Sequence, residues 1–413
     1  MKRTVFPLLA LALTGAATGL ALVRSTPHPE GFSHERHHAG PDSARVEAFL
    51  GGLKAADPML CEMLADQVGN FWNSYGDFGV GLLADGSRSW ESARDSLYSP
   101  PTDAAALRRI VRGFDDPNPC VRRAAAKLLG HGQVGQIYAV IREGLRSPSA
   151  RVREAAALAA GHTDGPELGE DLLRATRDAN VAVVAMATTA LGQLERRESV
   201  ERLNELARHD EVRVRRAAAH ALGQLEDARG LPALHPLLKD ADEGVRVLAA
   251  EALGHIENAA SLDPLLGGLG DASARVRAAA AHSLGQLQQP RAAAALGRAV
   301  GDQDERVRHA AVEALGDLDD LDQAPPELIA VLKSDDPELR KAGAEAFGNI
   351  HDPRAIDGLA GLLGDPDREV RRAALRGLAH IQDERVTPYL LKALKDSDRE
   401  IRKLAAEALG DRK

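Results

Sequence analysis

The stretch RVRRAAAHALGQL, residues Arg213–Leu225, is an alanine-rich segment that the chain repeats many times with small changes. Two further copies read GVRVLAAEALGHI at residues 244–256 and RVRAAAAHSLGQL at residues 275–287. In the first copy the apolar residues follow the spacing of a single helix face, at Val214, Ala217, Ala218, Ala221 and Leu222. The stretch therefore predicts a helix whose buried face is narrow and lined by small side chains.

The copies recur every 31 residues, apart from one interval of 32. Aligned on the residue near their end, they place these positions in register: Gly130, Gly161, Gly192, Gly223, Gly254, Gly285, Gly316, Gly348, Ala379 and Gly410. A second amphipathic stretch lies between consecutive copies, for example SLDPLLGGLGD at residues 261–271. A fixed period of this length is typical of stacked helix pairs that complete one another's cores. The sequence predicts an all-α fold, a right-handed α-solenoid of about ten helix pairs over residues 101–413.

The ends of the predicted helices are also marked in the sequence. The glycine of each copy suits a left-handed residue at a helix C-terminus. An aspartate precedes most copies, where its carboxylate can accept hydrogen bonds from free backbone N–H groups. These aspartates are Asp116, Asp178, Asp240, Asp271, Asp302, Asp365 and Asp396.

A turn aspartate followed by VRxxAAxALG resembles the short HEAT-like repeats of the phycobilisome-lyase (PBS lyase) type, over residues 101–413. The resemblance implies a ladder in which the turn Asp pairs with the Arg after the Val of a neighbouring repeat. In this sequence the arginines at the ladder position are Arg122, Arg153, Arg215, Arg246, Arg277, Arg308, Arg340, Arg371 and Arg402. Val184 takes this position in one repeat, where we expect a local weakness or bend. The resemblance specifies a fold more than a function, because such repeats serve as scaffolds in unrelated settings.

The composition supports stacked small helices. Of the 413 residues, 44% are apolar but only 3% are aromatic, so the core depends on alanine and leucine rather than on large rings. The formal net charge is −9 and the isoelectric point about 5.9. Nucleic-acid binders usually carry a basic stripe, so we expect no nucleic-acid partner.

The N-terminus resembles an export signal. Lys2 and Arg3 precede an uncharged apolar stretch at residues 5–23, so residues 1–25 are predicted to be a signal peptide or, uncleaved, a membrane anchor. The body is then expected in the periplasm or anchored to the outer face of the cytoplasmic membrane. Residues 26–44, rich in His, Pro and Gly, are predicted to be a linker.

Residues 45–100 are predicted to form a degenerate helical cap. They hold seven of the chain's thirteen aromatic residues, which suit a lid over the apolar face of the first repeat or, alternatively, an aromatic binding site. Cys61 and Cys120 are the chain's cysteines. An exported location favours a disulfide between them, whereas a separation of about two repeats exceeds disulfide reach unless the intervening segment folds aside.

No catalytic constellation stands out. HERHH, with His34, Glu35 and His38, matches a zinc-protease pattern, but it lies in the predicted linker rather than on a long helix. The alternative is adventitious metal binding by His28, His34, His37 and His38. HEAT-repeat iron hydroxylases use His-Glu pairs, yet His220, His282 and His309 are followed by other residues. We therefore predict no enzyme activity, no cofactor and no metal, with such a hydroxylase as the disfavoured alternative.

Two polar columns are expected to line one surface. One lies six residues after each Val and includes His220, Glu251, His282, Glu313, Glu345 and Arg376; the other lies ten residues after it. By analogy with related repeats, the first column would follow the concave side. Its acidic middle would attract a basic protein or peptide. A metal held by His220, Glu251 and His282 is a weaker alternative. The sequence thus predicts a protein-interaction scaffold, with a purely structural envelope spacer as the second alternative.

Overall fold

The computed structural model describes residues 43–57, 61, 104–130, 135–163, 165–318, 321 and 323–412. All of them fall within one compact unit, Ala39–Lys413. Regular structure in these ranges is entirely helical, which confirms the predicted α-solenoid. None of the helices in the described ranges is long and apolar enough to cross a membrane. The predicted export segment, HERHH and most of the predicted cap lie outside the described residues.

The helices alternate between two rows. The first row carries the repeated phrase and is called the inner helices: α5 (Pro119–Gly130), α7 (Ala150–Gly161), α9 (Val181–Gln193), α11 (Val212–Leu225), α13 (Glu243–His255), α15 (Ala274–Gln286), α17 (Glu305–Asp317), α19 (Pro337–Asn349), α21 (Arg368–His380) and α23 (Arg399–Gly410). The outer helices are α4 (Ala104–Gly113), α6 (Gly135–Leu145), α8 (Gly169–Ala175), α10 (Val200–Leu206), α12 (Leu231–Leu237), α14 (Leu262–Gly268), α16 (Ala293–Ala299), α18 (Pro326–Val331), α20 (Ile356–Leu362) and α22 (Thr387–Ala393). A further helix, α1 (Ser43–Ala55), precedes them.

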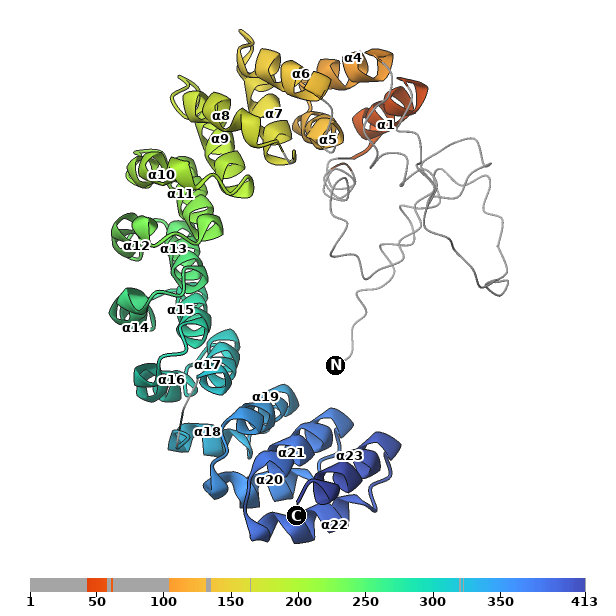
Figure 1. The fold of residues 1–413 in the computed structure, drawn as a ribbon, viewed down its shortest axis with the longest axis vertical. Coiled ribbons are helices and arrows are strands. Elements are labelled where there is room, and N and C mark those ends of the chain that lie inside the picture. The colour runs from red at the N-terminus through yellow and green to blue at the C-terminus, as the bar shows by residue number, and fades with distance from the viewer. Residues whose placement is uncertain are drawn as a thin grey trace, which may run out of the picture. The chain divides into compact units, whose positions relative to one another are not determined.

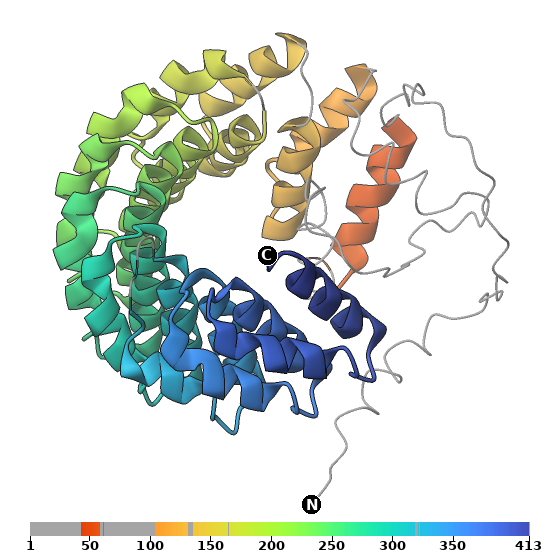
Figure 2. The same ribbon diagram turned by 60° about the horizontal axis from the view of Figure 1, so that its bottom comes forward.

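The two rows pack differently. Consecutive inner helices contact each other along their length, whereas consecutive outer helices barely touch. The inner helices therefore form the tighter row, on the inside of the curve within this unit (Figure 1). Figure 2 shows the same stacking of pairs from another direction. The core lies between the rows and is built from Val, Ala and Leu of the phrase together with Leu of the outer helices.

The glycine of the phrase is not a left-handed helix end, contrary to the expectation from sequence. Gly223 lies inside α11 and is buried, and the left-handed residues at these helix ends are instead Glu195, Glu226, Glu257 and Gln288. A Cβ added to Gly223 would lie 2.9 Å from the Cα of Ala252 in the next inner helix. Glycine is required because neighbouring helices approach too closely for any side chain.

The turns before the inner helices are organised by side-chain oxygens. The Oδ1 of Asp271 accepts the backbone N–H of Ser273 at 2.8 Å, and the Ser273 hydroxyl accepts the N–H of Arg275 at 3.2 Å. In the preceding repeat Asp242 takes the place of the serine and accepts the N–H of Val245 at 2.9 Å. These oxygens satisfy donors that a helix start leaves free.

The Arg–Asp ladder joins consecutive repeats. Arg246 donates to the carboxylate of Asp271 through Nε at 2.8 Å and Nη2 at 3.1 Å. Its Nη1 donates to the carbonyl of Asp240 at 2.9 Å, so one guanidinium ties two turns together. The same pairing occurs in Arg153–Asp178, Arg215–Asp240, Arg277–Asp302, Arg340–Asp365 and Arg371–Asp396.

The remaining ladder positions do not form this ion pair within the described residues. Arg122, Arg308 and Arg402 still donate to two carbonyls of the preceding turn. At the break, Val184 is buried, and the residue that replaces the turn Asp is His209, whose Nδ1 accepts the N–H of Glu211 at 3.0 Å. The histidine still accepts the backbone hydrogen bond of the turn, whereas the described residues of this junction form no Arg–Asp ion pair. The weakness expected there stays a prediction.

A disulfide joins Cys61 to Cys120, which corrects the geometric argument made against it from the sequence. Their Cα atoms are 6.0 Å apart. Helix α1 packs directly on α4 and α5, and Cys61 follows α1 closely in the chain. Two stacked repeats between the cysteines would exceed disulfide reach, whereas Cys61 lies beside the helix that carries Cys120.

Candidate functional site

The first polar column lies on the solvent side of the inner helices. In α11 the buried side is formed by Val214, Ala218 and Leu222. His220 lies on the other side of the helix and is exposed. Because neighbouring inner helices cover both flanks and the outer helices cover the back, this exposed stripe faces the inside of the curve. The structure places the six predicted partner-binding residues along it, with Glu251 half-buried and these five exposed: His220, His282, Glu313, Glu345 and Arg376.

Two neighbouring repeats bring part of this column together. Although the His220 side chain is exposed, neighbouring atoms reduce the hydration of its ring, and this is the main reason that its pKa is lowered; the charge of Glu251 opposes this shift and His255 adds to it. Glu251 and His255 are one turn apart on α13. His220 therefore faces a carboxylate and a second imidazole across α11 and α13, and it is mostly neutral near pH 7.

The second polar column has a structural role as well as an exposed one. Asn349 donates from Nδ2 to the carbonyl of Gly316 at 2.9 Å, and His380 Nδ1 lies 2.8 Å from the carbonyl of Gly348. In each case a side chain of one inner helix reaches the glycine carbonyl of the preceding one. This column joins repeats, so it is less free to contact a partner than the first.

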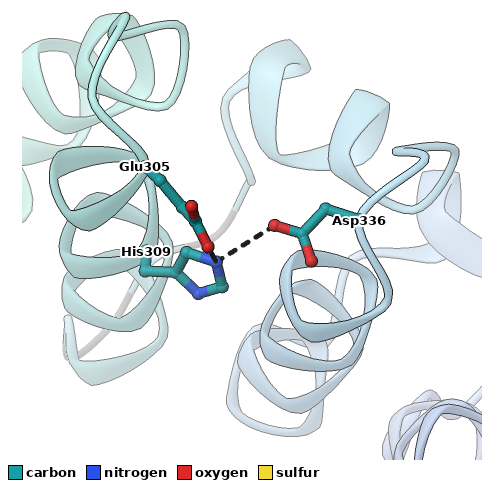
Figure 3. A group of neighbouring side chains, drawn as sticks. All are labelled: Glu305, His309 and Asp336. Atoms are coloured by element: carbon teal, nitrogen blue, oxygen red, sulfur yellow. Dashed lines mark hydrogen bonds and ion pairs between the residues drawn. The ribbon is translucent and has the colours of Figure 1, made fainter. Parts of the chain in front are cut away.

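A cluster that was not predicted lies at the start of α17 and α19. His309 Nε2 lies 3.3 Å from Asp336 Oδ2 and 4.0 Å from Glu305 Oε1, and the three side chains converge on one point (Figure 3). The ligand atoms of all three lie within 4.8 Å of one another. Partial burial opposes ionisation of Asp336, but hydrogen bonds from His309 and from two backbone N–H groups outweigh it and lower the pKa of the carboxyl.

This cluster was not predicted from the sequence because His309 was compared only with the residue that follows it. Glu305 and His309 are four residues apart, which places them on one helix face. That spacing was readable in the sequence. Asp336 comes from the next repeat, at the residue before α19, and its proximity required the stacking geometry.

The repeats match a known family model. The model for HEAT repeats matches residues 107–188, 169–246, 231–316, 298–371 and 359–413. This chain belongs to the HEAT-repeat family. The family expected from the sequence pattern is thereby confirmed, and the HEAT-repeat solenoid is a fold typical of protein-interaction scaffolds. Among curated proteins, none matches this sequence.

Solved structures with a TM-score above 0.5 share the HEAT solenoid fold. Importin beta is similar at 15% identity and a TM-score of 0.53, and Kap95p in complex with RanGDP at 13% identity and 0.52; in each case the match covers 89% of this chain and 60% of the other. The CpcE–CpcF complex of phycocyanin lyase from Nostoc sp. PCC7120 is 22% identical with a TM-score of 0.36, over 59% of this chain and 96% of that one. This chain therefore spans about three fifths of the length of the importin-type chains that it matches.

Proposed function

We propose that this HEAT-repeat protein is a scaffold, exported or tethered to a membrane, that binds a partner protein along its inner helices and has no catalytic activity of its own. The observation that carries the proposal is the exposed stripe of the inner helices. Along it the buried residues repeat almost unchanged, whereas the exposed residue differs from repeat to repeat, as in His220, Glu313 and Arg376. A surface of this kind can recognise a partner through dispersed contacts.

The partner is proposed to carry a basic surface. Glu313 and Glu345 are both exposed on adjacent inner helices, α17 and α19, and Glu251 lies two repeats before α17. Acidic side chains on one surface steer a basic partner and add to specificity. Kap95p, a HEAT-fold neighbour, binds RanGDP, which is a precedent for partner binding by this fold.

The proposed location outside the cytoplasm is supported by two features. The apolar N-terminal stretch at residues 5–23 follows two basic residues. The disulfide between Cys61 and Cys120 is typical of proteins in oxidising compartments. Treatment of intact spheroplasts with protease, followed by detection of the repeat array, tests this: an exported array is degraded, and an intracellular one survives.

The partner can be captured by in-cell photocrosslinking. A photoreactive residue at Glu313 on α17 reports on the inner surface, and the same residue at Glu327 on α18 is the matched control, because both glutamates are exposed and lie on opposite rows. We expect one protein adduct from position 313 and none from position 327. Adducts of equal yield from both positions, or none from either, would contradict a partner at the inner helices and favour the spacer.

Charge reversal then tests whether the acidic residues contribute. Glu313→Lys with Glu345→Lys removes two inner carboxylates, and Glu327→Lys with Asp357→Lys makes the same charge change on the outer helices α18 and α20. We expect the inner pair to weaken capture of the partner at low salt, with a smaller difference at high salt because screening reduces steering. Equal capture by both variants would show that the acidic residues do not contribute.

A further inference from the structure

The junction between α17 and α19 differs from the other junctions in the length of its repeat. The interval between the aligned glycines Gly316 and Gly348 is 32 residues rather than 31. Arg308 donates to the carbonyls of Asp302 and Gln303, and Ser334 stands where the following repeat has the ladder residue Asp365. The Arg–Asp rung that joins most consecutive repeats is therefore missing between these two helices.

A different set of side chains crosses this junction. Glu305 lies in the first turn of α17 and His309 follows one turn later. The two carboxylate oxygens of Asp336 have different partners. Oδ1 accepts the N–H of Glu338 at 3.0 Å and so caps α19, while Oδ2 faces His309. The cap therefore leaves one carboxylate oxygen of Asp336 directed at the imidazole.

The corresponding positions in an earlier repeat show what is unusual here. Two residues after Val214, the repeated Val of α11, Arg216 donates to both oxygens of Asp242, at 2.8 and 2.7 Å. Asp242 precedes α13 as Asp336 precedes α19. A permanent cation thus neutralises the capping carboxylate in that repeat. At the junction of α17 and α19 an imidazole replaces the guanidinium, and a second carboxylate, Glu305, joins it.

The distances are compatible with a shared ion as well as with a direct contact. The 3.3 Å between His309 Nε2 and Asp336 Oδ2 is at the long end of the usual hydrogen-bond range of about 2.7–3.2 Å. It equals the separation of about 3.3 Å between two ligands at a tetrahedral ion with bonds of about 2.0 Å. The Glu305 carboxylate is 70% exposed, so its side chain can close the remaining gap by rotation.

We propose that Glu305, His309 and Asp336 bind a divalent transition-metal ion of the zinc class and so staple α17 to α19. Imidazole nitrogen and carboxylate oxygen are normal zinc ligands, and solvent would complete the coordination. Because the ligands come from two repeats, the ion would hold together a junction at which the Arg–Asp ion pair is missing. Its role is structural, and it is independent of the partner proposed above.

The test compares zinc binding by the full chain and by variants, using competition with a chromophoric chelator at pH 7.5. Glu305→Gln and His309→Gln each remove one ligand and leave the cap made by Asp336 intact. His282→Gln on α15 is the matched control, because it removes an exposed histidine outside the cluster. Circular dichroism melts without zinc check that all variants fold. Any zinc held by His28, His34, His37 and His38 contributes equally to every variant and cancels in the comparison.

We expect the Glu305 and His309 variants to bind one zinc ion fewer per chain than the parent and the His282 variant. Hydrogen exchange supplies a second readout: zinc should slow exchange of α17 and α19 in the parent and leave the His309 variant unchanged. Equal zinc binding by all four proteins would overturn the proposal and leave a hydrogen-bonded pair without a metal. Loss of zinc in the His282 variant as well would overturn it too, because the ion would then depend on other residues.

Discussion

At the scale of single residues, the array depends on close contact between inner helices. Gly223 and Ala252 meet at a distance that no Cβ can occupy, and Ala218 is fully buried in the same helix. Small residues at these positions let neighbouring helices approach, and this explains why a core with few aromatic residues is still continuous. The pattern VRxxAAxALG is thus a packing requirement repeated once per helix pair.

A glycine substitution tests this packing. Gly223→Ala should lower the free energy of unfolding by roughly 1–3 kcal/mol, because the new Cβ meets the backbone of α13. Gly267→Ala in α14 is the control, since a Cβ there meets nothing within 4 Å, and the better helix propensity of alanine should stabilise the protein by up to about 1 kcal/mol. Urea unfolding followed by circular dichroism measures both. Equal effects of the two changes would contradict the close-packing interpretation.

At the scale of helices, the junctions between repeats are joined by charged side chains of the turns. The guanidinium of Arg246 contacts two successive turns, and Arg216 pairs with the residue that caps α13. Hydrogen bonds from Arg216, against a smaller effect of burial, lower the pKa of Asp242 to about 2. Each carboxylate therefore stabilises the fold only while it is ionised.

The lowered pKa of Asp242 predicts that the protein becomes less stable as the pH falls through a defined range. Because the folded pKa of Asp242 lies below the usual Asp value of about 3.9, its contribution is present above pH 4 and is lost as the pH falls toward 2. Asp242→Asn keeps a good capping residue but removes the charge. We expect the parent to lose roughly 0.5–1 kcal/mol more than this variant between pH 5 and pH 2, after allowance for solvent screening.

Thermal or urea unfolding at several pH values supplies the measurement. Asp263→Asn is the control, since Asp263 is 77% exposed and 3.4 Å from an exposed arginine, and it should follow the parent. Parallel stability curves for the parent and the Asp242 variant would show that this ion pair contributes nothing to the junction.

At the scale of the whole molecule, the stability of a repeat array is approximately the sum of the stabilities of its repeats and of the interfaces between neighbours. A destabilising change therefore affects mainly the repeats next to it. The disulfide between Cys61 and Cys120 joins the segment after α1 to the first inner helix, α5. It closes a long loop at one end of the array. Its effect should therefore be confined to that end.

Reduction of the disulfide tests this local behaviour. Chain-entropy estimates give about 4 kcal/mol for a closed loop of this length. We expect dithiothreitol to speed hydrogen exchange in α1, α4 and α5 and to leave α19–α23 unchanged. The double variant Cys61→Ser, Cys120→Ser should show fast exchange with or without reductant. Faster exchange along the entire array would instead indicate one cooperative unit.

Spacing along the chain was enough to predict the fold class, the period and the residues of both polar columns, because each depends on positions along one helix and is repeated in every copy. The other features depend on tertiary contacts. The function of Gly223 and the pairing of Cys61 with Cys120 depend on which surfaces meet when helices stack. The same holds for Glu305, His309 and Asp336, since Asp336 reaches the other two only through the packing of α19 against α17. Spacing along one helix can be read from a single chain, whereas contact between helices requires their distance and rotation.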